Sequence, residues 1–258
     1  MSDASRQPTE RFSDRVEDYV RYRPGYPEEV VRVLEKELGI RAEATRVVDI
    51  GSGTGISAEL FVRRGYTVIG VEPNEAMRAA STKRFASQPL FRTIAGSAEA
   101  TTLPDGSADL VVAAQAFHWF DRARARPEIA RILAPGGALA LAWNDRHTDT
   151  TPFLRGYEDA LRSWSIDYAK VSHQDLSPAE VTAFFGPGGC AVRTFEHHQD
   201  FDWAGLLGRA MSSSYVPLPG QPGHGELVAR LRDLFDAHAA NGLIRFEYDT
   251  KLYFGPLR

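Results

Sequence analysis

The sequence predicts an α/β domain built on a doubly wound, mostly parallel sheet. Between residues 46 and 143, short apolar segments alternate with segments whose apolar residues recur at helical spacing. The apolar segments show no polar alternation, which is typical of parallel strands covered on both faces. A glycine-rich turn, Gly51–Gly55, joins the first of these strands to the helix after it. Together these observations favour repeated βαβ units with short connections.

The predicted elements up to residue 143 have recognisable start and stop signals. The helix at 28–38 has its apolar residues on one face and is ended by Gly39. Asn74 is a suitable N-cap for a helix that runs to about Phe85. In chain order the elements are helix 16–22, helix 28–38, strand 46–50, helix 56–64, strand 66–71, helix 75–85, strand 91–95, strand 109–114, a helix with Pro127 as its first residue that ends at Pro135-Gly136-Gly137, and strand 138–143.

The pattern of elements changes after Asp145. A helix with three aromatic residues is predicted at 152–170, and Ser177 precedes another helix that starts at Pro178. The later elements are predicted as strand 192–201, helix 203–212, helix 226–240 and strand 244–254.

Composition excludes several classes of protein. Apolar residues make up 43% of the chain and charged residues 25%, as in ordinary globular proteins. The net charge of −4 gives no support for binding to nucleic acid or to anionic membranes. Cys190 is the single cysteine, which fits a reducing compartment. No apolar run reaches the roughly 20 residues that span a bilayer, and residues 1–10 lack a signal-peptide core, so we expect a cytoplasmic protein.

The glycine turn and the next strand predict a nucleoside site. Glu72 ends the second apolar strand, and a carboxylate at that position can accept hydrogen bonds from both hydroxyls of a ribose. A dinucleotide-binding fingerprint requires its third glycine at the position where this chain has Ile56. In this chain the third glycine, Gly55, comes one residue early. The sequence also lacks a phosphate-binding P-loop motif. A bound nucleoside without a pyrophosphate is therefore favoured.

Three motifs resemble those of class I S-adenosylmethionine-dependent methyltransferases. They are Val48–Gly55, Gly70–Asn74 and Leu133–Leu139. The resemblance implies a seven-stranded sheet of order 3-2-1-4-5-7-6 with an antiparallel strand seven, and helical additions that form a cap. It also implies S-adenosylmethionine as the cofactor.

The resemblance further implies a division of the chain into parts. Residues 1–10 are polar and are expected to be a disordered tail. Residues 11–258 are expected to form a single domain. Its parts would be an N-terminal lid at 11–40, a cofactor-binding core at 41–145, and a cap with the last two strands at 146–258.

The same resemblance assigns cofactor contacts residue by residue. Gly51 and Gly53 would lie against the methionine part, Asp49 would orient their loop, and Glu72 would hold the ribose. Many relatives use an aspartate near the adenine, and here Ser97 stands in its place. Arg23 could pair with the carboxylate of the cofactor. The full set of implied cofactor-binding residues is Asp49, Gly51, Ser52, Gly53, Glu72, Pro73, Met77, Ser97, Ala98, Gln115 and Arg23.

The methyl acceptor is expected near the segment that follows the fourth strand. His118 there could remove a proton from a substrate hydroxyl, or it could shape the pocket wall. The segment from Phe12 to Pro27, together with this histidine-tryptophan segment, resembles the branch of trans-aconitate methyltransferase-like proteins. Aromatic rings suit a lid over a sulfonium, because their faces attract cations. The candidate substrate-binding residues are Tyr19, Tyr22, Trp119 and Tyr215.

The sequence leads to one main function and two alternatives. We expect a methyltransferase that acts on a small molecule at a carboxylate or hydroxyl oxygen, as a monomer or homodimer without nucleic-acid or membrane partners. A non-catalytic S-adenosylmethionine-binding regulator stays open, because methyl transfer requires no side-chain nucleophile. An NAD-dependent oxidoreductase is disfavoured by Ile56. No metal is expected, since His197 and His198 are adjacent on a strand and would point to opposite faces.

Overall fold

The computed structural model describes residues 16–166, 168 and 177–257. The predicted tail at residues 1–10 lies outside this range. So do residues 12–15 of the aromatic segment that starts at Phe12. The chain divides into two compact units, each with its own core. We call them the core unit (Gly25–Asn144, Gln174–Phe195 and Thr250–Arg258) and the helical unit (Met1–Pro24, Asp145–His173 and Glu196–Asp249).

Strands and helices alternate through the first half of the chain, as the sequence predicts. The helices are α1 (Val16–Tyr22), α2 (Glu29–Leu38), α3 (Ile56–Arg63), α4 (Glu75–Arg84), the short 3₁₀ helix η3 (Phe117–Trp119), α5 (Arg122–Ile132), α6 (Pro152–Trp164), α8 (Pro178–Phe185), α9 (Trp203–Met211) and α10 (His224–His238). The strands are β1 (Arg46–Ile50), β2 (Thr67–Val71), β3 (Phe91–Ile94), β4 (Ala108–Ala114), β5 (Leu133–Arg146), β6 (Ala191–Phe201) and β7 (Ile244–Gly255).

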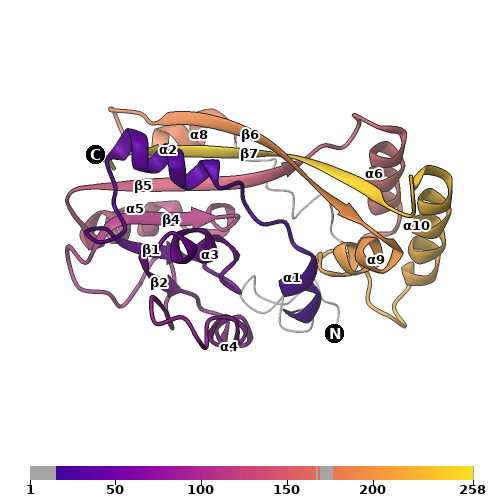
Figure 1. Cartoon of the computed structure of the whole chain (residues 1–258), viewed down its shortest axis with the longest axis horizontal. Helices are drawn as coiled ribbons and strands as arrows, with labels where there is room; N and C mark the ends of the chain where they lie inside the picture. The colour runs from indigo at the N-terminus through magenta and orange to yellow at the C-terminus, as the bar shows by residue number, and fades with distance from the viewer. Residues whose placement is uncertain (1–15, 167, 169–176, 258) are drawn as a thin grey trace. The chain divides into compact units, whose positions relative to one another are not determined.

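The seven strands form one sheet in the order β3-β2-β1-β4-β5-β7-β6, which confirms the expected order. The pairs from β3 to β5 are parallel. Figure 1 shows β7 running in the opposite direction to β5 and β6. Ile50 at the end of β1 is in register with Val71 at the end of β2. The residues that follow β1 and β2 therefore start from the same edge of the sheet.

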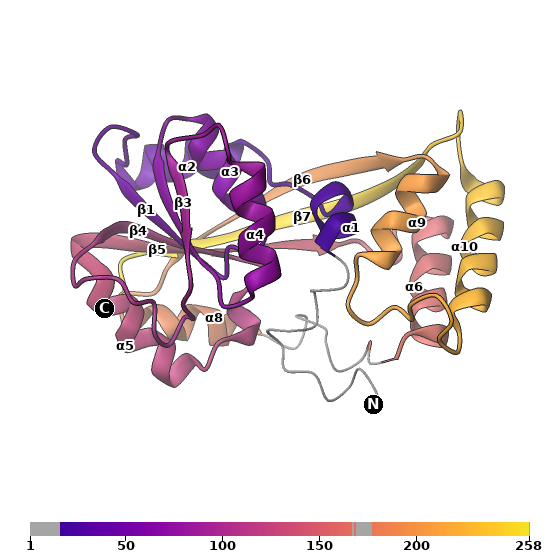
Figure 2. The same cartoon turned by 90° about the horizontal axis from the view of Figure 1, so that it is seen from below.

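Helices cover both faces of the sheet in the core unit (Figure 2). Val47 packs on one face in a cluster with Val31 of α2 and Phe61 of α3. The next residue, Val48, packs on the opposite face in a cluster with Ile129 of α5. Side chains alternate between faces along a strand, so both neighbours are buried only when both faces are covered. This explains the continuously apolar strands of the sequence.

Helix α5 does not begin where the sequence predicts. Asp121 caps it by accepting a hydrogen bond from the Arg124 amide at 3.3 Å, and Pro127 lies inside the helix. The prediction that Pro127 is the first residue is wrong. The segment from Arg122 to Arg126 consists of arginine and alanine, which are strong helix formers, so the helix starts at the better cap. Burial of Ile129 against the sheet offsets the one hydrogen bond that proline cannot donate.

Three other elements differ from the sequence prediction by two residues or more. Strand β5 is much longer than the predicted 138–143, and the Pro135-Gly136-Gly137 segment belongs to it. Helix α6 ends at Trp164, where Ser165 adopts an extended conformation, and not at residue 170. Helix α10 starts two residues earlier than predicted, after Gly223 with a φ of 85°. Local sequence patterns do not report the tertiary partners that extend or end an element.

The helical unit has a separate aromatic core between α6, α9, α10 and the strand residues assigned to it. Gly156 of α6 leaves room for the side chain of Leu234 of α10, and Gly208 of α9 leaves room for the ring of Tyr22. A side chain at either glycine would collide with that neighbour. These glycines therefore allow α6 to approach α10 and α1 to approach α9 closely.

Candidate functional site

The glycine turn after β1 depends on left-handed backbone. Gly51, Gly53 and Gly55 have φ values of 68°, 54° and 84°, a region that side chains disfavour. The Gly51 amide donates to the carbonyl of Val71 at 2.8 Å, which ties the turn to the end of β2. Gly55 is the N-cap of α3. The turn thus leads the chain from the sheet edge directly into a helix.

The three glycines differ in what surrounds them. A Cβ atom on Gly51 would lie 2.5 Å from the Cβ of Ala116, and one on Gly55 would collide with the ring of Phe85. A Cβ atom on Gly53 would have no atom within 4 Å. Gly51 and Gly55 are therefore required by the packing of the protein itself. Gly53 is the position of the turn where the backbone is open to a ligand.

Glu72 connects the glycine turn to the start of α4. Its Oε2 atom accepts a hydrogen bond from the Gly53 amide at 2.9 Å, and its Oε1 atom accepts one from the Asn74 amide at 2.8 Å. The residue is buried, and this burial raises the pKa of its carboxyl group. Each carboxylate oxygen can accept more than one hydrogen bond. Glu72 can therefore hold the turn and still accept bonds from a ligand.

Asp49 lies in β1 and contacts the first turn of α3. The Ser57 hydroxyl donates to its Oδ2 atom at 2.6 Å, while its buried Oδ1 atom has no hydrogen-bond partner among the described residues. Burial raises the pKa of the Asp49 carboxyl to about 7, and the nearby Glu72 carboxylate adds to this effect. Asp49, which is predicted to orient the glycine turn, thus holds the beginning of α3.

The raised pKa of Asp49 predicts a pH dependence of stability. The folded protein keeps a proton on Asp49 that the unfolded chain releases between about pH 4 and about pH 7. The contribution of Asp49 to the free energy of unfolding is largest below this window. It falls as the pH rises through the window and is constant above it.

Asp49→Asn keeps an acceptor for Ser57 but removes the titration. We expect the free energy of unfolding to decrease less between about pH 5 and about pH 7.5 in the variant than in the wild type. Urea denaturation at both pH values measures this difference. The same decrease in both proteins would contradict the assignment of the raised pKa to Asp49.

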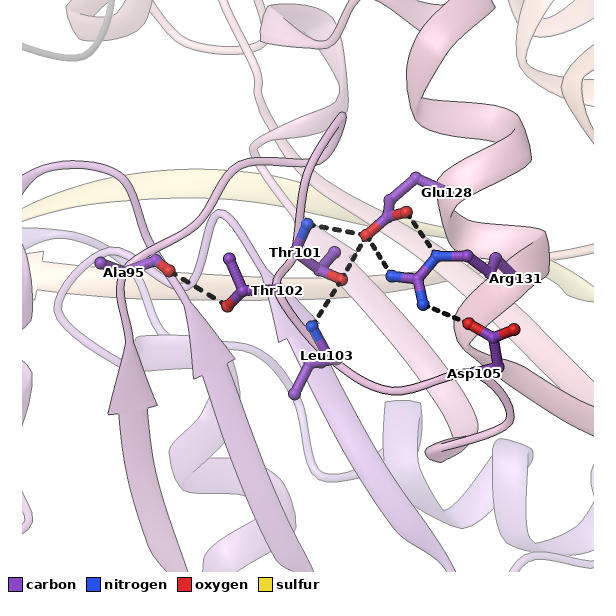
Figure 3. A network of polar contacts seen from close by, with 7 residues as sticks. All are labelled: Ala95, Thr101, Thr102, Leu103, Asp105, Glu128 and Arg131. Atoms are coloured by element: carbon purple, nitrogen blue, oxygen red, sulfur yellow. Dashed lines mark hydrogen bonds and ion pairs between the residues drawn. The ribbon is translucent and has the colours of Figure 1, made fainter.

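The loop after β3 carries Ser97 and Ala98, and a polar network fixes its far end. Glu128 of α5 accepts hydrogen bonds from the amide of Thr101 at 2.8 Å and from its hydroxyl (Figure 3). Arg131 donates to both carboxylate oxygens of Glu128, and these bonds lower the pKa of Glu128 to about 2. The loop closes through an amide-carbonyl pair between Ser97 and Ala100. Glu128 of α5 thus holds the far end of the loop that carries Ser97 and Ala98.

The segment after β4 begins with a strained residue. Gln115 has a φ of 55°, and its side-chain amide donates to the carbonyl of Asn144 at 3.0 Å. A non-glycine residue in this region costs free energy and is common at functional sites. His118 follows in η3, half-buried, with its ring 4.8 Å from that of Trp119. Phe117 is fully buried and anchors this segment.

Four of the candidate residues, Tyr19, Tyr22, Arg23 and Tyr215, lie in the helical unit. Arg23 donates to the carbonyl of Ser212 at 3.0 Å, and its guanidinium lies over the ring of Tyr19 at 5.1 Å. Tyr22 packs on α9, and Tyr215 packs against Tyr168 with ring centroids 4.8 Å apart. The structure therefore brings Tyr19, Arg23 and the start of the segment after α9 together.

The helical unit also contains polar residues that the sequence analysis did not identify. Arg209 is only 6% exposed and donates to the hydroxyls of Tyr248 and Ser213. Arg146 pairs with Glu158 at 2.6 Å, and its guanidinium lies over Tyr157 at 4.9 Å. No sequence signal marks these two arginines, because neither lies in a motif or in a local group of arginines.

Two further sequence expectations can be compared with the structure. His197 is half-buried and stacks on Tyr248, whereas His198 is exposed, so the two side chains point to opposite faces as predicted. Among the residues that the structure describes, no group of three or more histidine, cysteine or acidic residues is arranged to hold a metal ion. Within the same residues, every helix is too short or too polar to cross a membrane.

Comparisons with known sequences identify the family. Residues 48–141 match the family model described as a methyltransferase domain. An uncharacterized methyltransferase of Mycobacterium tuberculosis is 41% identical over 243 residues, which cover 90% of this chain and 90% of the relative. Trans-aconitate 2-methyltransferase of Variovorax paradoxus is 37% identical over 127 residues, or 48% of each chain. The first relative matches nearly the whole chain, including both units.

Comparison with solved structures supports the same fold. A protein of Anaeromyxobacter dehalogenans that carries a type II methyltransferase assignment aligns with a TM-score of 0.64 and 22% sequence identity. The alignment covers 92% of this chain and 98% of that protein. At this identity the likeness concerns the fold, whereas the closer sequence relatives establish the family. This chain belongs to the class I S-adenosylmethionine-dependent methyltransferases, with S-adenosylmethionine as its cofactor and methyl donor.

Proposed function

We propose that this methyltransferase transfers the methyl group to a carboxylate oxygen of a small organic acid. The similarity to trans-aconitate 2-methyltransferase carries the proposal, because the name of that relative specifies a carboxylic acid as the acceptor. The segment after β4 is compatible with it. From Gln115 to Phe120 the only ionisable side chain is that of His118, so the segment is mostly apolar.

The described residues of the core unit fit a bound S-adenosylmethionine. Gly53 has open space at its Cα atom, and the buried hydroxyls of Ser52 and Thr54 have no hydrogen-bond partner among the described residues. These features leave backbone and hydroxyl groups of the turn available to a polar ligand. Glu72 would accept bonds from the ribose hydroxyls, and Gln115 would lie at the amino-acid end. The proposed cofactor-binding residues of the core unit are those that the family resemblance implies: Asp49, Gly51, Ser52, Gly53, Glu72, Pro73, Met77, Ser97, Ala98 and Gln115. Arg23, which the resemblance also implies, belongs to the helical unit.

A carboxylate acceptor requires little chemistry from the protein. When bound, S-adenosylmethionine supplies a methyl group on a positively charged sulfur. A carboxylic acid with an ordinary pKa of about 4 is already ionised at neutral pH, so no base has to remove a proton. The remaining task of the residues is to hold the carboxylate oxygen in line with the methyl group and to exclude water. His118 and Trp119 would then form part of the wall.

His118 distinguishes a carboxylate acceptor from a hydroxyl acceptor. With a carboxylic acid, His118→Ala should leave kcat within about threefold of the wild type, because proton removal is not needed. With a hydroxyl or amine acceptor, the same change should lower turnover by roughly tenfold or more. Steady-state kinetics on one acceptor of each kind measures the difference. A large loss on the carboxylic acid would contradict a carboxylate acceptor that needs no base.

A screen with S-adenosylmethionine labelled in its methyl group tests the proposed function directly. Small mono-, di- and tricarboxylic acids would be compared with phenols and amines. A methyl ester releases labelled methanol in mild alkali, whereas methyl ethers and methylamines keep the label. Alkali-labile products from acids alone would support the proposal. Labelled product that resists alkali, or turnover only on phenols or amines, would reject it.

A further inference from the structure

Asn144, near the end of β5, is bonded to three residues that are distant from it in the sequence. Its side-chain nitrogen donates to the backbone carbonyl of Gly25 at 2.8 Å, and its side-chain oxygen accepts from the Thr250 hydroxyl of β7 at 2.6 Å. Its own backbone carbonyl accepts from the side-chain amide of Gln115 at 3.0 Å. All four residues belong to the core unit. Gly25 and Asn144 are the first and last residues of one segment of that unit, and Thr250 is the first residue of another.

The two side-chain bonds fix the amide of Asn144 in one orientation. A carbonyl can only accept a hydrogen bond, so the Gly25 carbonyl selects the side-chain nitrogen, which can only donate. The side-chain oxygen then faces Thr250, whose hydroxyl can donate. Asn144 is 4% exposed and Thr250 is fully buried, so the Asn144 amide is shielded from water. The end of β5, and with it the backbone carbonyl of Asn144, is thereby held in one place.

Gln115 is the residue that uses this backbone carbonyl. Strand β4 ends at Ala114, and the Gln115 side chain continues the pairing with β5 by donating to Asn144. The nitrogen of the Gln115 amide is engaged in this bond, whereas its Oε1 atom has no hydrogen-bond partner among the described residues. The next residue, Ala116, packs against Gly51 of the glycine turn. An unused acceptor oxygen is therefore carried by the neighbour of a residue that contacts the turn.

We propose that Asn144 is a positioning residue for cofactor binding, which fixes the amide of Gln115 so that its oxygen faces the ammonium group of S-adenosylmethionine. This assignment rests on the proposed contact of Gln115 with the amino-acid end of the cofactor. An ammonium group has donors and no acceptor, so it can bond only to the oxygen end of an amide. The backbone of Gln115 has a φ of 55°, and a strained residue persists only where its surroundings hold it. The bond to Asn144 supplies such a hold.

Two variants remove the support of Asn144 and leave Gln115 in place. Asn144→Ala removes both side-chain bonds, and the nearly isosteric Thr250→Val removes one of them. Thr45→Val is the matched control, because Thr45 is also a buried threonine of the core unit whose hydroxyl oxygen has a partner, the Arg41 amide. Thr45 precedes β1, whereas the glycine turn follows it, so the control lies at the opposite edge of the sheet.

Calorimetric titration would compare S-adenosylhomocysteine with its analogue that lacks only the α-amino group. We expect Asn144→Ala and Thr250→Val to raise the Kd for S-adenosylhomocysteine about fivefold, because the Gln115 side chain must then be ordered on binding. The Kd for the analogue should stay within about twofold in both variants, as should both constants in Thr45→Val. Gln115→Ala should raise the Kd for S-adenosylhomocysteine about tenfold through loss of a charged hydrogen bond. Adding Asn144→Ala to Gln115→Ala should change this Kd by less than about twofold, since Asn144 acts through Gln115.

These measurements separate the role of Asn144 from the proposed contact of Gln115. Equal weakening of both ligands in Asn144→Ala and Thr250→Val, with folding confirmed by thermal unfolding, would reject the role of Asn144. A further loss of about fivefold in the double variant would also reject it, because the two residues would then act independently. Wild-type binding of both ligands by Gln115→Ala would reject the proposed contact of Gln115 as well. No methyl acceptor is present in these titrations, so their outcome is independent of whether a carboxylate is methylated.

Discussion

Glu72→Ala is expected to weaken S-adenosylmethionine binding by about 2 kcal/mol, which corresponds to roughly 30-fold in Kd. The substitution removes the carboxylate that would accept charged hydrogen bonds from the ribose. It also removes the acceptor of the Gly53 amide, which is bonded to Glu72 at 2.9 Å, so the glycine turn would be less well ordered. Isothermal titration calorimetry with S-adenosylmethionine measures the change.

A matched control separates the role of Glu72 from a loss of negative charge in this region. Glu75 lies three residues further on, is exposed and belongs to the first turn of α4, and Glu75→Ala should leave Kd within about twofold. Glu72→Gln retains one acceptor oxygen and should fall between the wild type and the alanine variant. Unchanged affinity in Glu72→Ala would mean that the ribose is held elsewhere.

Gly51→Ala and Gly53→Ala are expected to fail in different ways. Both positions have left-handed backbone, so a side chain costs about 1–2 kcal/mol of stability at each. At Gly51 the new methyl group would also collide with Ala116, which adds about 1–3 kcal/mol. At Gly53 the new methyl group meets open space, and the fold should lose little beyond the backbone term.

Cofactor affinity should fall more in Gly53→Ala than in Gly51→Ala, which is the opposite of the order expected for stability. The methyl group of Gly53→Ala would stand where the backbone approaches the ligand, so we expect Kd for S-adenosylmethionine to rise at least about tenfold in a protein that still folds. Urea denaturation gives the stability of each variant and calorimetry gives the affinity. Gly25→Ala serves as a control, because a Cβ atom there also meets open space and its φ is not left-handed. A normal affinity in Gly53→Ala would show that the ligand does not approach the turn at this residue.

The strands of the sheet could be predicted from the sequence because the patterns that mark them are local. Continuous apolar segments mark strands that are covered on both faces, and the turn glycines mark positions where only glycine avoids strain. The N-cap at Asn74 is confirmed by the bond from the Met77 amide at 3.0 Å. Pro127 misled the prediction, because the cap at Asp121 and tertiary burial outweighed the preference of proline for a first turn.

The grouping of arginines in the helical unit could not be predicted in the same way. Arg23 is a candidate from the sequence, but Arg146 and Arg209 lie in no motif, and the three arginines are far apart in the chain. Only packing of α1, α9 and the strand ends within one unit determines which arginines are buried and which find a carboxylate. Burial and pairing depend on residues that are distant along the chain, so no spacing pattern reports them.

The sequence by itself predicted the fold class of this protein, and its resemblance to a known family implied the strand order and the cofactor. The signals that carry them, such as the turn glycines Gly51, Gly53 and Gly55 and the position of Glu72, are properties of short segments. The tertiary structure alone decided which of these residues the fold requires and which faces open space, since that depends on Ala116 and on Phe85. It also decided which buried arginines have no carboxylate partner among the described residues, because charge balance is a property of the packed unit and not of the chain.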